Sequence, residues 1–533
     1  MPKRYPASPH VLADRPHVWA FLAGCAAVTA GVLMHLPMFW MGRNNGFHLA
    51  DMPMDAEMGW GMALITLGIV VSAYGLLPKR AAANGAGIAT LDITAPEDAA
   101  LTGAHWRLMI VLTVALVIDV MKPASLGFVL PGMTAEYAVP KTTVAWLPFA
   151  ALCGTVVGSV AWGWLADVYG RRGSILLSAV MFVGTAICGS MPSLWWNVGM
   201  CFLMGAAAGG MLPVTYALLA ETMPSKHRGW GLVLVGGLGA VGGYLAASGF
   251  AAWLEPLLSW RILWFLNLPT GLLLIFLNTF IPESPNYLVA QGRLDEARAT
   301  LRRFGCTLRN AAAPPSRRPT AAAATTVGVR GLAGRTWALS IIALAWGLIN
   351  FGLLLWMPVH LVEKGYSMAI SSTLLAASAL IAIPIVFVAA LLYSRWSSKG
   401  ALLGAIVITA LGLIGLVHLE LSSGTNANPV WPIALLIVGI NAIIAMLLPY
   451  AAESYPLSIR GRATGWVAAC TKGGGLIAQL LSLLGLVPAL FVAALAILLP
   501  LLVGLVLVWR YCSETRGRDL RDLEDDTPLE QVT

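Results

Sequence analysis

The sequence consists largely of continuous apolar runs of about 20 residues, the length that a helix needs to cross the hydrocarbon core of a bilayer. Hydrophobic residues make up 58% of the chain and charged residues 11%, whereas soluble globular proteins carry about 25% charged residues. Such a composition cannot cover a surface that faces water. Continuous runs also exclude a membrane β-barrel, whose strands are about 10 residues of alternating hydrophobicity. The sequence therefore predicts an all-α membrane protein.

Fourteen runs fit this description, and they fall into groups of two, six and six. The expected spans lie near 18–41, 58–78, 106–132, 143–165, 173–191, 195–219, 229–252, 261–281, 337–361, 371–392, 401–420, 431–451, 463–486 and 488–510. This order predicts an N-terminal hairpin (1–80), a cytoplasmic linker (81–105), a six-helix bundle (106–282), a central loop (283–336), a second six-helix bundle (337–510) and a tail (511–533). Within the central loop, we expect a short amphipathic helix at 292–304 and a disordered low-complexity segment at 311–326.

The basic residues predict the orientation, because Lys and Arg accumulate in cytoplasmic loops. If the N-terminus is cytoplasmic, the inside segments hold 27 of the 33 Lys and Arg residues, and the outside loops hold only Arg43, Lys141, Arg261 and Lys364. We therefore expect a multi-pass protein of the cell (inner) membrane with both termini in the cytoplasm. Because the net charge of +8 resides in these cytoplasmic loops, nucleic acid is not expected as a partner.

A motif that ends the fourth core span occurs again at the end of the tenth. Four pairs of identical residues are each separated by 232 positions: Glu221 and Glu453, Pro224 and Pro456, Arg228 and Arg460, Gly229 and Gly461. The six-helix unit has therefore been duplicated in the same orientation. Parallel repeats of this kind build the major facilitator fold.

Three loops resemble those of the major facilitator superfamily. Residues 163–172 (GWLADVYGRR) are similar to its signature loop GxLaDrxGRR. The stretch 282–297, with PESP and later GRLDEA, resembles a segment of sugar porters and their organic-ion relatives, and 513–517 (SETRG) resembles their PETKG. The chain is thus similar to the branch of sugar porters and of organic-ion and aromatic-acid symporters, with an extra N-terminal hairpin. The resemblance implies a secondary transporter that binds substrate near the membrane midplane, between the two repeats.

The charged loop residues can form contacts that open and close. Gly163 lets a neighbouring helix approach closely, Asp167 can face the positive N-terminus of another helix, and Arg171 can bridge carboxylates. The resemblance implies that such contacts act as a two-state latch in the inward–outward switch. The expected latch residues are Gly163, Asp167, Gly170, Arg171, Arg172, Glu221, Arg228, Glu453 and Arg460. The alternative is topological anchoring by positive charge alone.

Three charged residues fall within expected spans, where a charge costs about 2.5–3.5 kcal/mol on insertion scales. Asp119 and Lys122 lie three residues apart in core span one, and Lys472 lies beside three glycines in span eleven. Two cations near one acid suggest an anionic substrate, with Asp119 able to take up a proton. The alternatives are an Asp119–Lys122 pair that only lowers the insertion cost, and a Lys472 that snorkels to the cytoplasmic face. Further candidates for the cavity are Asn350, Trp356 and Gln479.

The chain departs from its relatives at positions that matter for specificity. Aromatic-acid relatives carry DGxD in span one, where this chain has Asp119-Val-Met-Lys122. Cys201 replaces an arginine of span four, and span five lacks the GP dipeptide of drug antiporters. A standard sugar or aromatic-acid specificity therefore cannot be carried over, and drug–proton antiport is not favoured.

The N-terminal hairpin is rich in methionine. Residues 34–62 hold seven of the 20 methionines, and Met54, Met58 and Met62 recur on one helix face. Thioether and imidazole groups can hold a soft metal such as Cu(I) on the outer side. The candidate ligands would be His35, His48, Met52, Met54 and Met58. The alternative is that methionine is flexible packing between helices and against lipid.

Together these features predict a fourteen-span secondary transporter rather than an enzyme. We expect it to take up a small organic anion, with the proton gradient as the coupling source, no bound cofactor, the lipid bilayer as its surroundings and a monomeric state. The alternatives are a soft-metal transporter that uses the hairpin, efflux of a metabolite or drug, and a non-transporting sensor on the same scaffold.

Overall fold

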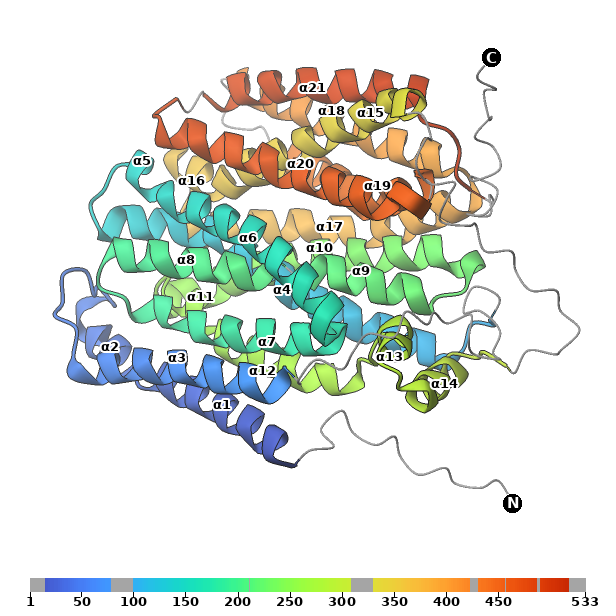
Figure 1. The fold of residues 1–533 in the computed structure, drawn as a ribbon. Coiled ribbons are helices and arrows are strands. Elements are labelled where there is room, and N and C mark those ends of the chain that lie inside the picture. Colours follow the sequence, from blue (N-terminus) through green and yellow to red (C-terminus); the bar gives the residue numbers. More distant parts are fainter. Residues whose placement is uncertain are drawn as a thin grey trace, which may run out of the picture. The chain divides into compact units, whose positions relative to one another are not determined.

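A computed structural model describes residues 15–77, 99–209, 211–307, 329–421, 430–455, 457–486 and 489–516 (Figure 1). Across these ranges the chain forms helices joined by turns and contains no strand. The expected disordered segment at 311–326 lies outside the described residues, as do most of the linker at 81–105 and of the tail at 511–533. The all-α fold expected from the apolar runs is confirmed.

Twelve helical stretches of the described chain are long and apolar enough to cross a membrane. They correspond to twelve of the fourteen expected spans; the exceptions are core spans four and eleven. Span eleven forms α20 (Leu457–Leu483), which is long enough to cross but carries Lys472 and Gln479 among its apolar residues.

Core span four is not one continuous helix, as 195–219 had been expected to be. The chain forms α8 (Leu194–Ala208) and α9 (Met211–Thr222), with Gly209 at the break. Gly209 approaches a neighbouring helix so closely that a Cβ atom there would clash with the carbonyl oxygen of Thr155. In addition, Ser159 Oγ donates a hydrogen bond to the Gly209 carbonyl oxygen at 2.9 Å. The Gly209 carbonyl is open to this bond because Pro213, four residues later, has no N–H to donate to it.

The chain divides into two compact units, and three long helices contribute to both: α4 (Gly103–Glu136), α6 (Trp146–Tyr169) and α10 (Ser225–Leu258). Unit 1 comprises Met1–Asp119, Cys153–Pro224 and Leu257–Arg309. Besides α8 and α9 it contains α1 (Arg15–Leu33), α2 (Leu36–Met41), α3 (Ala56–Leu76), α7 (Arg171–Gly184), α11 (Ile262–Phe265), α12 (Asn267–Leu277), α13 (Pro285–Ala290) and α14 (Leu294–Arg303). Helix α14 lies within the range 292–304 where an amphipathic helix is expected, and its Ala297 and Leu301 are buried.

The N-terminal hairpin packs through glycines. A Cβ atom at Gly24 would lie 2.6 Å from the Gly68 carbonyl oxygen, and one at Gly31 would lie 2.6 Å from that of Gly61. Small residues at this spacing allow the backbones of α1 and α3 to come into close contact. The hairpin in turn shares an apolar cluster with α7, which contributes Val180. In Figure 1 the blue helices α1 and α3 lie along α7.

Unit 2 comprises Val120–Leu152, Ser225–Pro256 and Asn310–Thr533. Besides α20 it contains α5 (Lys141–Val144), α15 (Val329–Gly347), the π-helix η7 (Leu348–Leu354), α16 (Leu355–Glu363), α17 (Met368–Arg395), α18 (Ser398–Leu421), α19 (Val430–Ser454) and α21 (Leu490–Tyr511). Helix α19 packs against α17, α18 and α20, so most of its residues are buried. The π-helix interrupts core span seven, which hydropathy predicts only as one apolar run.

Candidate functional site

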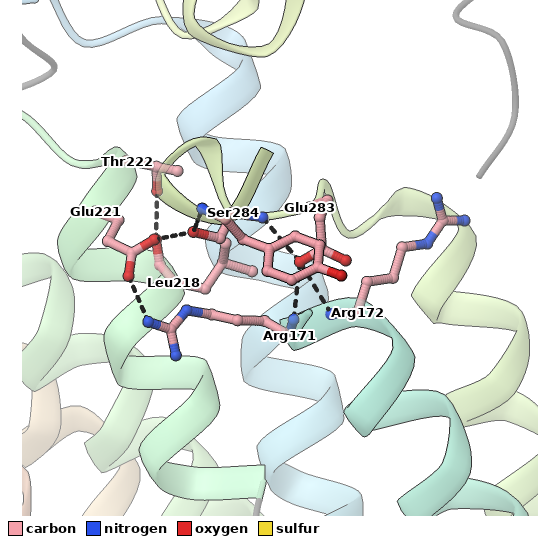
Figure 2. A network of polar contacts seen from close by, with 8 residues as sticks. Arg171, Arg172, Leu218, Glu221, Thr222, Glu283 and Ser284 are labelled. Atoms are coloured by element: carbon pink, nitrogen blue, oxygen red, sulfur yellow. Dashed lines mark hydrogen bonds and ion pairs between the residues drawn. The ribbon is translucent and has the colours of Figure 1, made fainter. Parts of the chain in front are cut away.

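A polar cluster in unit 1, here the Glu221 cluster, joins the end of α9 to the start of α7 and the segment before α13. It consists of Arg171, Glu221, Glu283 and Ser284 (Figure 2). Arg171 Nη2 lies 2.6 Å from Glu221 Oε1, and Ser284 Oγ donates a hydrogen bond to Glu221 Oε2. The two charged side chains are only 20% and 16% exposed. Because water reaches them so little, the attraction between the two charges is screened less than in an ordinary surface pair.

Glu283 holds the N-terminus of α7. Its Oε1 accepts backbone N–H groups from Arg171 at 2.8 Å, Arg172 at 3.4 Å and Ser284 at 3.0 Å. A carboxylate at this position satisfies donors that a helix start leaves open and faces the positive end of the helix dipole. Burial raises the pKa of Glu283, and the hydrogen bonds from these backbone groups oppose that effect.

Gly170 is required at the turn before α7. Its φ of +96° lies in the region that side chains rarely adopt, and a Cβ atom there would lie 2.6 Å from Glu283 Oε2. The sequence predicted Gly170 and Arg171 at this site, and the structure places both against Glu283. Arg172 lies next to them, in electrostatic contact with Glu283. Gly163 and Asp167 lie in α6, but their side chains are outside the described part of the chain, so their roles remain predictions.

A second polar cluster, here the Glu453 cluster, lies in unit 2 at the end of α19. The Tyr393 hydroxyl donates a hydrogen bond to Glu453 Oε2 at 2.6 Å, and Thr515 Oγ1 donates to the same oxygen at 2.9 Å. Glu514 Oε1 accepts the backbone N–H of Ser398 at 2.8 Å, at the start of α18. This carboxylate therefore holds a helix N-terminus in the same way as Glu283.

The acidity of Glu514 differs from that of Glu283. Burial raises the pKa of Glu514, but hydrogen bonds from the Ser397 and Ser398 hydroxyls and from the Arg516 backbone outweigh this effect and lower the pKa to about 2. The Glu514 carboxylate is therefore held in its ionised form.

The two clusters are structural repeats of one another. Glu221 corresponds to Glu453, as the shared motif predicted, and the pair Glu283-Ser284 corresponds to Glu514-Thr515, which lies 231 positions later. Among the latch candidates, sequence reasoning missed Glu283, its counterpart and the hydroxyl residues. The signal was present, because PES and SET already stood out as family-like segments and differ in position by almost the same offset as the two glutamates.

Arg228 lies in the first turns of α10 and interacts electrostatically with Glu453. Its neighbour Gly229 is so close that a Cβ atom there would lie 3.3 Å from Glu453 Oε1. Helix α10 follows the fourth core span and α19 contains the tenth, so this contact joins the two repeats within unit 2. Arg460 lies in α20, but its side chain is outside the described residues, so its role remains a prediction.

Four of the six cavity candidates lie in or near the π-helix that contains Phe351. Gln479 is fully buried; its Nε2 donates to the Phe351 carbonyl oxygen, and its Oε1 accepts Trp356 Nε1 at 3.3 Å. Lys472 Nζ lies 5.2 Å from the centre of the Phe351 ring, a cation–π distance. Asn350 precedes Phe351 in the same π-helix. Single π-helical turns within α-helices often occur at functional sites.

The glycines beside Lys472 in span eleven allow a close approach of the neighbouring helix. A Cβ atom at Gly475 would lie 2.7 Å from the Phe351 side chain, and one at Gly474 would clash with the Leu344 carbonyl oxygen. These glycines let α20 lie directly on α15 and η7, which places Lys472 beside the Phe351 ring.

The other two candidates lie in α4. Lys122 is 1% exposed and Asp119 is 6% exposed. The boundary between the two units falls just after Asp119, so Lys122 belongs to unit 2 and Asp119 to unit 1.

The candidate metal ligands of the hairpin lie in two different environments. His35 is fully buried, with its Nδ1 2.7 Å from the Gly31 carbonyl oxygen, and Met58 is buried in the apolar cluster of α1, α3 and α7, whereas His48 is exposed. Met52 and Met54 pack against the same cluster. Within the described ranges, no group of three or more His, Cys, Asp or Glu residues could hold a metal ion.

Comparison with known proteins identifies the family. Residues 108–478 match the sequence model of the Major Facilitator Superfamily. The niacin transporter NiaP of Acinetobacter baylyi is 27% identical over 387 residues, covering 70% of this chain and 86% of that protein. The benzoate transport protein of the same organism is 25% identical over 443 residues, covering 78% and 91%.

A solved structure has the same fold. The proton:xylose symporter XylE bound to 6-bromo-6-deoxy-D-glucose superposes with a TM-score of 0.64 at 18% identity, covering 79% of this chain and 98% of that chain. The N-terminal hairpin precedes the residues that match the family. The protein therefore belongs to the Major Facilitator Superfamily, as a multi-pass membrane transporter near the sugar-porter and aromatic-acid branch.

Proposed function

We propose that this transporter takes up a small organic anion together with protons, by alternating access between its two six-helix repeats. The observation that carries the proposal is Lys122, an ammonium group 1% exposed within a membrane-spanning helix. A buried charge at membrane depth is expensive and in general marks a substrate or ion pathway. An anionic substrate in this pathway would be attracted by the ammonium group.

The surroundings of Lys472 favour an aromatic carboxylate. An ammonium group beside the Phe351 ring, with Trp356 nearby on the next helical segment, offers a charge for a carboxylate and apolar faces for a ring. Two relatives are named for niacin and for benzoate, which are both aromatic monocarboxylates. Aromatic-acid relatives carry the second acid of their DGxD motif at the position of Lys122. Lysine at this position adds a cation to the substrate pathway, so we place a small carboxylate first among candidate substrates.

Proton coupling is assigned to Asp119. Its carboxyl group is 6% exposed and lies in the same helix as Lys122, one turn earlier. A carboxylate that accepts a proton from the outer side and releases it to the cytoplasm would couple uptake to the proton gradient. We place both termini in the cytoplasm and the Glu221 and Glu453 clusters at the cytoplasmic face, where the contact of Arg228 with Glu453 would close the inner side.

The test is uptake of labelled benzoate and nicotinate by proteoliposomes with an alkaline interior. We expect uptake by the wild type, at least a tenfold loss for Lys122→Gln or Lys472→Gln, and loss of proton-driven accumulation for Asp119→Asn with carboxylate exchange retained. Lys226→Gln is the matched control, because Lys226 is an exposed lysine at the start of α10. Carboxylate uptake that ignores both lysines would contradict the proposal. So would transport of xylose or Cu(I) in place of carboxylates.

A further inference from the structure

A ring of charged side chains surrounds one end of unit 2, far along the helices from the Glu453 cluster. Lys141, at the start of α5, forms a salt bridge with Glu363 Oε1 at the end of α16. Lys364 Nζ lies 2.5 Å from Glu420 Oε1 in the last turn of α18. His360 Nδ1 lies 3.7 Å from the other oxygen of Glu363. Helix α17 starts near this ring at Met368 and reaches Tyr393 of the Glu453 cluster at its other end.

These side chains line a cavity of about 500 Å³, together with Thr142, Gly485, Ala489 and Leu490. Small-molecule pockets commonly measure about 300–1,000 Å³. The cavity can therefore hold a small organic acid beside the ammonium groups of Lys141 and Lys364.

The charge of this cavity depends on His360. The titratable groups that act on it are Glu363, Lys141, Glu420 and Lys364. With neutral imidazole the two lysines balance the two glutamates; with protonated imidazole the set carries one net positive charge. Histidine is the side chain that changes charge between about pH 5 and 8. Burial opposes the protonation of His360 and the two glutamates favour it; once protonated, His360 changes the cavity from neutral to anion-attracting.

The Lys141–Glu363 salt bridge also joins the two repeats, because α5 belongs to the first and α16 to the second. A carboxylate bound in the cavity would compete with Glu363 for Lys141. Protonated His360 would at the same time offer Glu363 a second partner. Both effects weaken the contact between repeats at this end of unit 2.

We propose that this cavity is a second anion-binding site, on the outer side, which receives a small carboxylate when His360 is protonated and loosens the outer contact between the repeats. The proposal rests on the proposed function, because it takes its ligand class from there. It adds a receiving site remote from the Phe351 region.

The test measures benzoate binding by calorimetry to the full chain in lipid nanodiscs, at pH 5.5 and pH 7.5. The background is the double variant Lys122→Gln/Lys472→Gln, which removes the central lysines. We expect binding about tenfold tighter at pH 5.5, as one added charge at short range supplies about 1.4 kcal/mol. His360→Gln should abolish this difference, whereas His360→Lys should bind at pH 7.5 as tightly as the background does at pH 5.5. The matched control is His48→Gln, at an exposed histidine.

The two His360 variants have opposite expected results. Either variant alone can therefore decide the test if the other does not fold. Persistence of the pH dependence in His360→Gln would overturn the proposal. If the double variant binds no benzoate while wild-type uptake requires Lys122, this proposal fails and the proposed function stands. If the cavity binds benzoate with the expected pH dependence but no carboxylate is transported, the proposed function fails alone. If the wild type binds no carboxylate at either pH, both fail.

Discussion

The Glu221 and Glu453 clusters have the same backbone plan but different counter-charges. In each, one carboxylate holds the start of a helix and a neighbouring hydroxyl donates to the glutamate that the two repeats share. Glu221 has the guanidinium of Arg171 from its own repeat. At the equivalent place the second repeat has Ser398, and Glu453 is held by hydroxyls and by the electrostatic effect of Arg228 from the first repeat.

Because of this difference, we expect the two clusters to have different roles. The Glu221 cluster is balanced within unit 1, so it mainly holds the helices of that unit together. The Glu453 cluster takes its cation from the other repeat, so its charge balance depends on how the repeats meet. We therefore expect changes in the first to affect stability and changes in the second to affect transport.

The largest effect is expected for Arg171→Gln, which leaves the Glu221 carboxylate without its cation in a poorly hydrated site. Removing one partner of such a pair should cost about 3 kcal/mol of unfolding free energy. Glu221→Gln should recover part of that loss in the double variant, and the coupling is measured as a double-mutant cycle by denaturant unfolding. Arg298→Gln is the control, because its partner Asp295 is 99% exposed; a loss as large there would contradict the prediction.

A smaller effect is expected for Gly170→Ala, at about 2 kcal/mol, because alanine is strained at positive φ and its Cβ would meet Glu283. The control is Gly173→Ala in the same helix, where the nearest atom to a Cβ lies at 3.8 Å. The second repeat has Ser397 at the equivalent position, so Ser397→Gly should instead cost about 1 kcal/mol through its lost hydrogen bonds. Thermal unfolding separates these expectations, and equal losses for both glycine variants would refute the first.

Arg228→Gln should lower the transport rate about tenfold, equivalent to about 1.4 kcal/mol, with little change in the unfolding temperature. Glu453 keeps its hydroxyl donors Tyr393 and Thr515, so the fold retains its contacts while the link between repeats is lost. Lys226→Gln is the matched control. Unchanged uptake in Arg228→Gln, or a fall in stability as large as that of Arg171→Gln, would remove the distinction between the clusters.

The smallest effect is a difference in pH response. The pKa of Glu514 is lowered from 4.5 to about 2, so its contribution to stability is present above pH 4.5 and is lost as the pH falls toward 2. The pKa of Glu283 is raised, so its contribution is present below pH 4.5 and is lost as the pH rises through the raised value. When the pH falls from 5 to 3, the unfolding temperature of Glu514→Gln should therefore decrease less than that of the wild type. The unfolding temperature of Glu283→Gln should decrease more. The same response in both variants would show that the two carboxylates are equivalent.

The sequence predicted most of the fold, because membrane spans are set by the length of apolar runs. It placed the helices and the repeat, and the Glu221–Glu453 correspondence is confirmed in the geometry. The break at Gly209 was missed although Pro213, four residues later, was a signal for it. The sequence could not predict the π-helix at Leu348–Leu354, since that depends on contacts with another helix rather than on local hydropathy. The partners of Glu453 were missed for the same reason: Tyr393 and Thr515 are 60 and 62 positions away along the chain.

The N-terminal hairpin has a consequence for how this transporter meets its lipids. Helix α3 packs on α7, so α7 is withdrawn from the lipid annulus and the hairpin takes its place there. Aromatic residues mark both ends of the hairpin, with Trp19 69% exposed near one end and Trp60 71% exposed near the other. Tryptophans at both interfaces anchor a helix pair at a set depth. The thickness of the bilayer would thus influence α7 by way of the hairpin. A thinner or thicker membrane would in this way affect the helix that begins with Arg171.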